Sequence, residues 1–284
     1  MKQTKQLRQL LNREEILVAP GVFDGLSARL VERAGFNAIY ASGGAISRSF
    51  GYPDLDLLSV TEVHEALARI VDVTNIPIIG DADTGFGNSL NVKRTMRMFE
   101  HSGIAALHLE DQQFPKRCGH LANKALITKQ EMVHKIQVAR DSLLDPDFVL
   151  IARTDAIAVE GFESAIDRAQ AYLKAGADVI FVEAPETIEQ IEKIAQLIPQ
   201  PKLINMFQGG KTPLISTQRL QELGYKIIII PSDLQRAAIY AMENTLKVIH
   251  QDGNSAKISD KMVTFQQRET IIDTDNWLKL DTLP

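Results

Sequence analysis

The segment FVLIARTDAIAVEGFESAIDRAQAYLKAGADVIFVE, residues 148–183, contains the pattern that decides the fold. It begins with one apolar run, Phe148–Arg153, and ends with another, Asp178–Glu183. Neither run alternates between polar and apolar residues, which is typical of parallel strands covered on both faces. Apolar residues recur between the two runs at helical spacing: Ile166, Ala169, Tyr172 and Leu173. Gly176 follows the last turn as a C-cap, so the segment predicts a strand–helix–strand unit.

Similar runs occur along the rest of the chain and bring the number of predicted strands to eight. The other six are Ile16–Ala19, Asn37–Ala41, Ile76–Asp81, Ile104–Glu110, Lys202–Met206 and Lys226–Pro231. Eight strand–helix units in about 250 residues predict an α/β fold of the TIM (β/α)8 barrel type. No linker or low-complexity segment interrupts the series, so we expect a single domain over residues 1–284. A doubly wound sheet is the alternative, because sequence does not show strand order.

Two strand–helix connections carry extra, loop-like residues. They follow the second and fourth predicted strands and cover residues 42–54 and 111–123. Long loops after barrel strands lie on the face where active sites are built. We therefore expect both segments to contribute to the site.

The composition excludes several classes of protein. An apolar fraction of 45% excludes a disordered chain, and a net charge of −5 gives no reason to expect nucleic acid as a partner. The apolar runs are shorter than the roughly 20 residues that span a membrane, and the N-terminus does not resemble a signal peptide. One cysteine excludes an internal disulfide and a Cys-rich zinc site. We expect a cytoplasmic protein.

Polar side chains stand where the predicted strands end. They are Asp81 and Asp83, His108 and Glu110, Arg153, Glu183 and Asn205, from the third to the seventh strand in chain order. A buried charge is costly, and several carboxylates at one mouth repel one another unless a cation lies among them. Oxygen ligands of this kind favour Mg²⁺ or Mn²⁺ over zinc. The guanidinium of Arg153 suits a substrate carboxylate or phosphate.

Each of these residues also has an ordinary structural explanation. Asp83 can cap a helix near Asn88, and Glu183 can pair with Arg153 while it takes part in chemistry. For His108 we expect packing behind the site rather than metal binding. The recurrence of polar ends on four neighbouring strands favours a functional site.

The single cysteine lies in the motif Lys116-Arg117-Cys118-Gly119-His120. A lone cysteine is usually a small core residue, but these neighbours are charged or glycine rather than apolar. Two cations and a histidine favour the thiolate. We predict that Cys118 acts as an acid, a base or a nucleophile.

Two glycine-rich segments are ambiguous. Residues 208–213, Gln-Gly-Gly-Lys-Thr-Pro, can cradle a phosphate, position a carboxylate or simply form a turn. The Ser42-Gly43-Gly44 segment can likewise form an anion-binding nest from free backbone amides.

Taken together, five motifs resemble the isocitrate lyase/phosphoenolpyruvate mutase superfamily over nearly the whole chain. They are Ser42-Gly-Gly, Asp81-Ala-Asp-Thr-Gly-Phe-Gly87, His108-Leu-Glu-Asp-Gln112, Lys116-Arg-Cys-Gly-His120 and Ala152-Arg-Thr-Asp155. The Lys-Arg-Cys-Gly-His motif is specific to the lyase branch, which includes 2-methylisocitrate and 2,3-dimethylmalate lyases. The resemblance implies a barrel with a C-terminal helical extension, about residues 251–284, whose helix is swapped between subunits of a homotetramer.

The resemblance also implies roles for individual residues. It assigns Mg²⁺ to Asp81, Asp83 and Glu110. It assigns the substrate to Ser42, Gly43, Gly44, Arg153, Glu183, Asn205 and Arg236. It assigns catalysis to Cys118 as acid/base, to Arg117 and His120 as stabilisers of its thiolate, and to Tyr40 and Asp54 near the reacting oxygen.

The implied reaction cleaves a carbon–carbon bond of a 2-hydroxy acid. The metal stabilises the substrate alkoxide, cleavage leaves an α-oxo acid such as pyruvate, and Cys118 protonates the aci-form of the second carboxylic acid. Where 2-methylisocitrate lyases carry a threonine, this chain has Phe207. A bulkier, less polar pocket favours a 2-alkylmalate such as 2,3-dimethylmalate, with 2-methylisocitrate second.

Three other functions remain open from sequence. An oxaloacetate hydrolase or decarboxylase is one, although decarboxylases of the family lack the cysteine. A phosphonomutase of the phosphoenolpyruvate or carboxyphosphonoenolpyruvate type is another, but those enzymes usually lack the Cys-Gly-His segment. A ligand-binding barrel without activity would show gaps in the polar set, and we find none.

Overall fold

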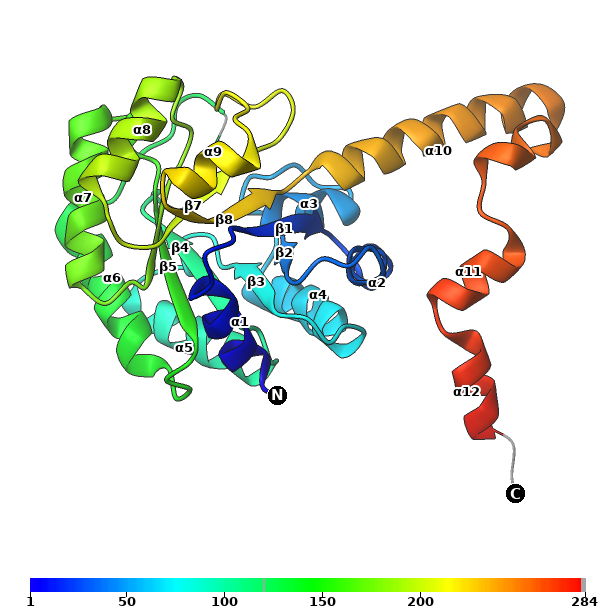
Figure 1. Ribbon diagram of the computed structural model, residues 1–284, viewed down its shortest axis with the longest axis horizontal. Helices are drawn as coiled ribbons and strands as arrows, with labels where there is room; N and C mark the ends of the chain where they lie inside the picture. Colours follow the sequence, from blue (N-terminus) through cyan, green and yellow to red (C-terminus); the bar gives the residue numbers. More distant parts are fainter. Residues whose placement is uncertain (120, 282–284) are drawn as a thin grey trace.

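The computed structural model describes residues 1–119 and 121–281, and its centre is a closed barrel of eight parallel strands (Figure 1). The strands are β1 (Leu17–Val22), β2 (Ile39–Ala41), β3 (Ile78–Asp81), β4 (Ala106–Glu110), β5 (Val149–Thr154), β6 (Val179–Val182), β7 (Lys202–Asn205) and β8 (Tyr225–Ile230). Each strand pairs with the next in sequence, and β8 pairs with β1. This order confirms the TIM barrel and excludes the doubly wound sheet.

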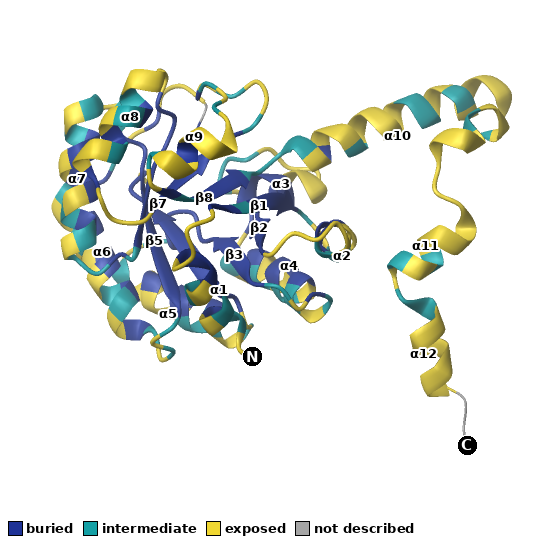
Figure 2. Ribbon diagram, viewed as in Figure 1, coloured by how far each residue is buried: buried dark blue, intermediate teal, exposed yellow. Residues whose placement is uncertain are grey.

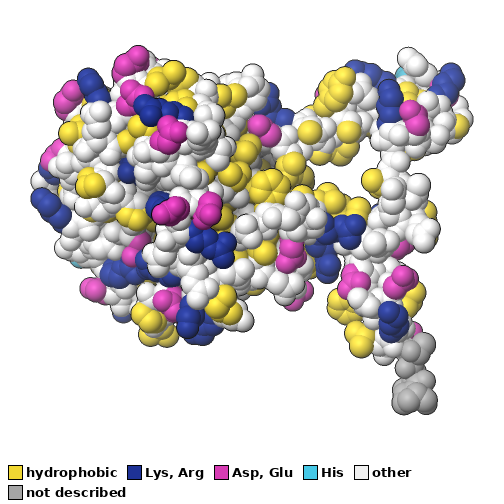
Figure 3. Space-filling model, viewed as in Figure 1, with side chains coloured by type: hydrophobic (Ala, Val, Ile, Leu, Met, Phe, Trp, Pro, Cys, Tyr) yellow, Lys and Arg dark blue, Asp and Glu magenta, His cyan; other side chains and the backbone are white. Residues whose placement is uncertain are grey.

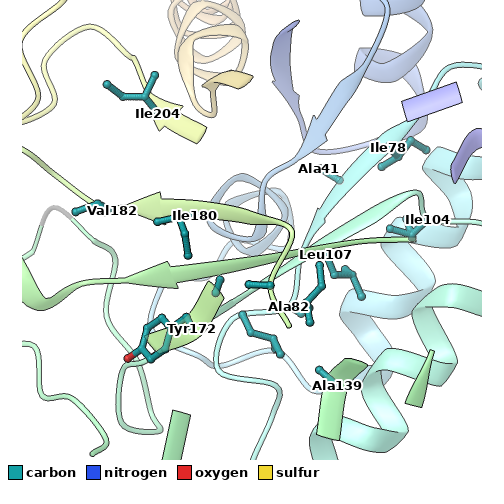
Figure 4. Packing of buried hydrophobic residues seen from close by; sticks show 14 of the residues in the cluster. Ala41, Ile78, Ala82, Ile104, Leu107, Ala139, Tyr172, Ile180, Val182 and Ile204 are labelled. Carbon is teal, nitrogen blue, oxygen red and sulfur yellow. The ribbon is translucent and has the colours of Figure 1, made fainter. Parts of the chain in front are cut away.

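The outer faces of the strands are covered by helices, as the apolar stripes predict. These helices are α2 (Gly25–Arg33), α4 (Val60–Asp72), α5 (Ser89–His101), α6 (Lys129–Ser142), α7 (Phe162–Lys174), α8 (Ile188–Leu197) and α9 (Thr217–Glu222). Figure 4 shows part of the resulting core, where Tyr172 of α7 lies near Ile180 of β6. Gly176, just after α7, takes a φ of 115°, as its predicted capping position requires.

One expected loop is partly helical. Within residues 42–54, α3 spans Gly43–Ser49. The Ser42 hydroxyl accepts a hydrogen bond of 3.3 Å from the Ala45 amide and so caps the helix. The two glycines of the motif therefore form a helix start rather than an irregular turn, and sequence underestimated the helix because glycine disfavours it.

The barrel interior changes from apolar to charged along each inward row of side chains. Ile79, Ile151 and Phe181 belong to the inner hydrophobic cluster. Two residues further along the same strands, or at their ends, come Asp81, Arg153 and Glu183. Because side chains alternate along a strand, these charged residues continue the inward rows at the carboxyl end.

At the amino end the barrel is closed by an N-terminal helix that the sequence patterns did not predict, α1 (Gln3–Leu11). Its Leu7, Leu10 and Leu11 are buried in the inner cluster. Arg8 donates to the carbonyl oxygen of Phe148 at 2.9 Å and pairs with the Asp178 carboxylate at 2.9 Å. These contacts fix α1 against the starts of β5 and β6.

The chain then leaves the barrel as an arm, residues 233–281. The arm contains α10 (Asp233–Asp252), a short 3-10 segment (Ala256–Lys261), α11 (Phe265–Ile271) and α12 (Thr274–Asp281). It departs earlier than the expected residue 251, and Figure 2 shows that it is mostly exposed. Figure 3 shows apolar side chains along it. Within the described residues, no helix is both long and apolar enough to cross a bilayer.

Candidate active site

A small polar cavity of about 100 Å³ lies at the carboxyl end of the barrel. Eight of the residues singled out from sequence line it: Ser42, Gly44, Asp54, Asp81, Cys118, Arg153, Glu183 and Asn205. They come from strand ends and from both of the long connections, as expected. Residues separated by more than 160 positions in the chain are thus brought to one site by the barrel.

A cluster of potential metal ligands lies beside this cavity. Ligand atoms of Asp81, His108 and Glu110 all lie within 4.8 Å of one another, and the three side chains are buried. His108 therefore joins Asp81 and Glu110 where the sequence led us to expect Asp83. Burial, followed by the charge of Arg153, lowers the pKa of His108 to about 3, so its ring is neutral near pH 7. Its Nε2 lies 2.8 Å from the hydroxyl of Tyr40.

The packing role expected for His108 is also present. Its ring stacks on that of Tyr40, with the ring centroids 5.7 Å apart. Tyr40 donates to Asp81 Oδ2 at 3.3 Å, and burial together with the Asp81 charge raises its pKa well above the usual value. Tyr40 therefore keeps its proton and supports Asp81 from below the cavity.

Asp83 lies just beyond β3 in a left-handed conformation, with a φ of 46°. Its Oδ1 lies 2.7 Å from Lys116 Nζ, which is also 2.5 Å from Asp54 Oδ1. Asn88 caps α5, so the capping explanation for Asp83 is wrong. Burial raises the pKa of Asp83 to about 6, against the lowering effect of Lys116.

From the sequence, Lys116 was expected only as one of two cations that favour the Cys118 thiolate, and in the structure it is a central cation of the site. Burial by itself would lower its pKa, but the surrounding carboxylates, led by Asp83 and Asp54, raise it well above the usual value. No local sequence signal shows this, because the contacts depend on how residues 112–126 return to the barrel mouth.

The oxygen atoms of this region fit a divalent cation. Glu110 Oε2 is buried and accepts no hydrogen bond, with Arg153 Nε 3.3 Å away, whereas Asp83 Oδ1 is paired with Lys116 Nζ at 2.7 Å. Burial raises the pKa of Glu110 well above the usual value, in spite of the Arg153 charge. Unsatisfied buried acceptors are costly, and a hard cation uses such oxygens as ligands. The chemistry of the donor set therefore agrees with a metal site.

Gly43 and Gly44 allow backbone to approach these carboxylates. The amide of Gly43 donates to Asp81 Oδ2 at 3.1 Å. A Cβ at Gly43 would lie 2.7 Å from Asp81 Oδ2, and one at Gly44 would lie 2.6 Å from Asp54 Oδ2. Any side chain at either position would displace an acidic residue of the site.

Arg153 is held in place by three carboxylates. Its Nε donates to Asp155 Oδ2 at 2.8 Å, and its guanidinium lies 3.3 Å from Glu110 and 3.6 Å from Glu183. The predicted ion pair with Glu183 is thus confirmed. Burial opposes the charge, but these carboxylates raise the pKa of Arg153 well above its usual range, so it stays cationic.

The remaining predicted residues lie away from the cavity lining. Arg117 is exposed and donates to the Ala122 carbonyl at 3.4 Å, and His120 lies outside the described residues. Arg236 is exposed, pairs with Asp233 at 3.6 Å and donates to the carbonyl of Gln208. The cavity-lining member of the connection after β7 is Phe207.

Arg48 of α3 also lines the cavity, and sequence reasoning missed it. Its positive charge helps to lower the pKa of Asp54, after the larger and opposed effects of burial and Lys116. Within the described residues, Arg48 makes no side-chain hydrogen bond or ion pair, unlike Lys116 and Arg153. It therefore brings a positive charge to the rim that is free to meet an anion.

The chain matches one protein-family model, described as phosphoenolpyruvate phosphomutase, over residues 7–250. It is 42% identical over 268 residues to the 2,3-dimethylmalate lyase of Eubacterium barkeri, covering 94% of this chain and 93% of that protein. It is 44% identical to the 2-methylisocitrate lyase of Aeropyrum pernix, covering 97% of this chain and 89% of that protein.

A solved structure gives the same picture of the fold. The complex of an oxaloacetate acetylhydrolase with the inhibitor 3,3-difluorooxalacetate superposes with a TM-score of 0.94 at 35% identity. The match covers 99% of this chain and 96% of that one. The similarity thus extends over the arm as well as the barrel.

Proposed function

We propose that this chain, which belongs to the phosphoenolpyruvate mutase/isocitrate lyase superfamily, is a metal-dependent carbon–carbon lyase of the oxo-acid-lyase type. Its reaction would cleave a 2-hydroxy acid to an α-oxo acid such as pyruvate and a second carboxylic acid. The observation that carries the proposal is that a thiol, Cys118, and a fixed cation, Arg153, share one cavity beside a metal-binding cluster.

Asp81 and Glu110 would hold the metal, with Asp83 close by and His108 packed beside Asp81. The metal we propose is Mg²⁺, with Mn²⁺ as a substitute, because the donors are mainly carboxylate oxygens. When bound, such a cation supplies Lewis acidity that favours loss of the proton from a substrate hydroxyl.

Side chains of the cavity would bind the substrate and accept its hydroxyl proton. Arg153 binds the carboxylate next to the hydroxyl, since its geometry is set by Asp155 and Glu183 before substrate arrives. Asp54 lines the cavity and would accept the hydroxyl proton. Lys116 overcomes the effect of burial and keeps the pKa of this carboxyl low, so Asp54 is present as the unprotonated carboxylate. The hydroxyl oxygen then becomes the oxo group of the first product.

Cleavage sends the bonding electrons to the departing carbon. Cys118, on the same cavity, donates its thiol proton to that carbon and completes the second carboxylic acid. The thiolate is reprotonated when the products leave. The small volume of the cavity, about 100 Å³, leaves little room for water to compete for the carbanion.

Two cavity residues support a 2-alkylmalate as the substrate. Phe207 provides an apolar wall suited to an alkyl group, and Arg48 provides a positive charge for a second carboxylate. A substrate such as 2,3-dimethylmalate carries both features. 2-Methylisocitrate, which has a third carboxylate, is the second choice.

We also propose a homotetramer in which α10 and the following helices pack on a neighbouring subunit. Tyr240, Leu246 and Trp277 of the arm are 70%, 64% and 67% exposed in the single chain, and burial of such side chains is favourable. The cytoplasm is the proposed location, because a reducing compartment keeps the Cys118 thiol available.

The proposal is tested by assaying release of oxo acid from a panel of substrates. The panel contains 2,3-dimethylmalate, other 2-alkylmalates, 2-methylisocitrate and oxaloacetate, with Mg²⁺ or with a chelator, and lactate dehydrogenase reports pyruvate. We expect Mg²⁺-dependent pyruvate from an alkylmalate, and a loss of about 10³-fold in Cys118→Ser. Pyruvate from no member of the panel, or full activity of Cys118→Ser, would contradict it.

An oxaloacetate hydrolase is the second candidate, because the solved acetylhydrolase superposes so well. Chromatography of the same reactions distinguishes the two, since hydrolysis of oxaloacetate yields oxalate and acetate rather than pyruvate. In the lyase, Arg48→Gln should reduce kcat/KM for the dicarboxylates by about tenfold or more, because it removes a charge-assisted contact.

A further inference from the structure

Cys118 lies between Arg117 and Gly119, and the backbone of each is fastened, that is, hydrogen-bonded, to a buried side chain. The first fastening comes from Gln112, which is 1% exposed. Its Nε2 donates to the carbonyl of Arg117 at 2.8 Å, and its Oε1 accepts from the amide of Arg117 at 3.1 Å. The same Nε2 also donates to Glu110 Oε1 at 2.8 Å. Gln112 thus connects the residue before the thiol to the metal-binding cluster.

The second fastening is on the other side of the thiol. Lys124 Nζ donates to the carbonyl of Gly119 at 2.6 Å and to Asp155 Oδ1 at 2.7 Å. Asp155 also binds the guanidinium of Arg153. Lys124 therefore connects the residue after the thiol to the arginine that faces the cavity. A buried ammonium between a carboxylate and a carbonyl is a charge-assisted contact, which is stronger than a neutral one.

Gly119 itself packs against the floor of the cavity. A Cβ at this position would lie 2.5 Å from Arg153 Nη2 and 2.8 Å from Glu183 Cγ. The backbone beside the thiol is therefore in close contact with the substrate-binding residues. A small displacement of Gly119 would move Cys118 relative to Arg153.

We propose that Gln112 and Lys124 are positioning residues that fix the Cys118 thiol over the cavity by holding the backbone on either side of it. Neither residue lines the cavity, so both act through the backbone of Arg117 and Gly119 rather than on the substrate. The chemical role of the thiol rests on the proposed function, but its placement does not. Gln112 is anchored at Glu110 and Lys124 at Asp155, and Arg153 lies within contact of both carboxylates.

The chain's single cysteine makes the placement measurable, since alkylation by iodoacetamide reports on Cys118 alone. The rate is measured by mass spectrometry with and without saturating oxalate and Mg²⁺, in wild type, Gln112→Leu and Lys124→Met. In wild type, oxalate should slow alkylation by about tenfold or more, because a ligand in the cavity covers the thiol. In both variants this protection should fall to about threefold or less, while the dissociation constant of oxalate, from calorimetry, changes by less than about threefold.

Activity gives a second readout. With the preferred substrate, kcat should fall by about 10- to 100-fold in both variants at a nearly constant KM, because the proton donor is misplaced while the carboxylate anchor remains. Lys124→Arg keeps the charge and should recover much of the loss. Lys129→Met is the matched control: Lys129 is a partly exposed residue at the far end of the same connection, paired with Asp167 on the surface, and its loss should change nothing.

Three results would overturn the proposal. They are wild-type protection in both variants, a loss of oxalate binding in parallel with the loss of protection, and an equal effect of Lys129→Met. The alkylation arm does not depend on turnover. If the panel of acids shows no lyase activity, the proposed function fails, while protection by oxalate still decides whether the two residues place the thiol.

Discussion

The same inward rows of side chains form both ends of the barrel, but the two ends differ in the volume of their cavities and in the charge of the residues that line them. The amino end carries the larger hollow, about 570 Å³, bordered by Thr4, Glu100 and Leu144 among others. The carboxyl end carries a cavity of only about 100 Å³, with cations and carboxylates converging on it. Convergent charge, rather than volume, therefore identifies the candidate site in this molecule.

The two ends also contribute differently to stability. At the amino end, Leu7, Leu10 and Leu11 bury apolar surface, which favours folding. At the carboxyl end, Glu110 and Asp83 are buried and titrate above their usual range, which is a cost to folding. Activity and stability should therefore respond to substitutions at opposite ends.

The largest effect is expected from Glu110→Gln at the carboxyl end. Loss of this buried carboxylate should reduce kcat/KM by about 10³-fold or more, since a metal ligand is removed. Binding of Mn²⁺, followed by electron paramagnetic resonance, should weaken by about 100-fold. The melting temperature should stay within about 2 °C of wild type or rise, because a costly buried charge is gone.

A strong loss of stability in Glu110→Gln, or activity within tenfold of wild type, would contradict this contrast between the two ends. In the first case the charged end would be a stabilising element, and in the second the cluster would not be catalytic.

At the amino end, Leu7→Ala should have the opposite outcome. Leu7 is completely buried in the inner cluster, so its truncation should reduce the free energy of unfolding by about 3 kcal/mol. Urea unfolding measures this loss, and kcat of the folded enzyme should be unchanged. Leu144→Ala is the control, because Leu144 is at the same end but 66% exposed, and its cost should be below about 0.5 kcal/mol. A drop in kcat for Leu7→Ala would show that the ends are coupled.

The smallest effect concerns pH and a buried lysine at the start of β7. Lys202 Nζ donates to the carbonyl oxygens of Ile198 and Gln200, and burial lowers its pKa to about 8. The unfolded chain, with a pKa near 10.4, binds more protons between these values, so stability rises with pH there. Between pH 8 and 10, the free energy of unfolding of wild type should therefore rise by about 2 kcal/mol relative to that of Lys202→Met.

Urea midpoints of the two proteins across this pH range provide the measurement. The urea midpoint of Lys129→Met should follow that of wild type, since Lys129 is only partly buried and pairs with Asp167 at the surface. A difference in urea midpoint between wild type and Lys202→Met that does not change with pH would mean that Lys202 has the same pKa in the folded and unfolded chain, which would contradict the prediction.

Sequence patterns predicted most of the barrel because the fold repeats a local signal. All eight predicted strands are present, with ends that move by at most three residues. Strand alternation also predicted that His108 and Glu110 share a direction, and both belong to the cluster of potential metal ligands. Local periodicity and strand alternation are sufficient for these features, since each is set by neighbours in the chain.

Other features depend on contacts between distant segments and were not predictable in this way. Lys116 reaches Asp54 and Asp83 only because residues 112–126 return to the barrel mouth. Arg48 faces the cavity because α3 forms where glycines suggested a loop. The helix α1 was missed because its leucines find their partners in the starts of distant strands.

The position of Phe207 has a consequence for engineering. The charged residues of the site stand on strand ends or are fastened to them, whereas Phe207 follows β7 in a connection that runs to α9. Variation at this position changes the shape of the cavity without touching the ion pairs of Arg153 or Lys116. Directed evolution toward other hydroxy acids should therefore begin with the codons for residues 206–210. Substitutions there can change which acid fits the cavity while the charged residues of the site stay the same.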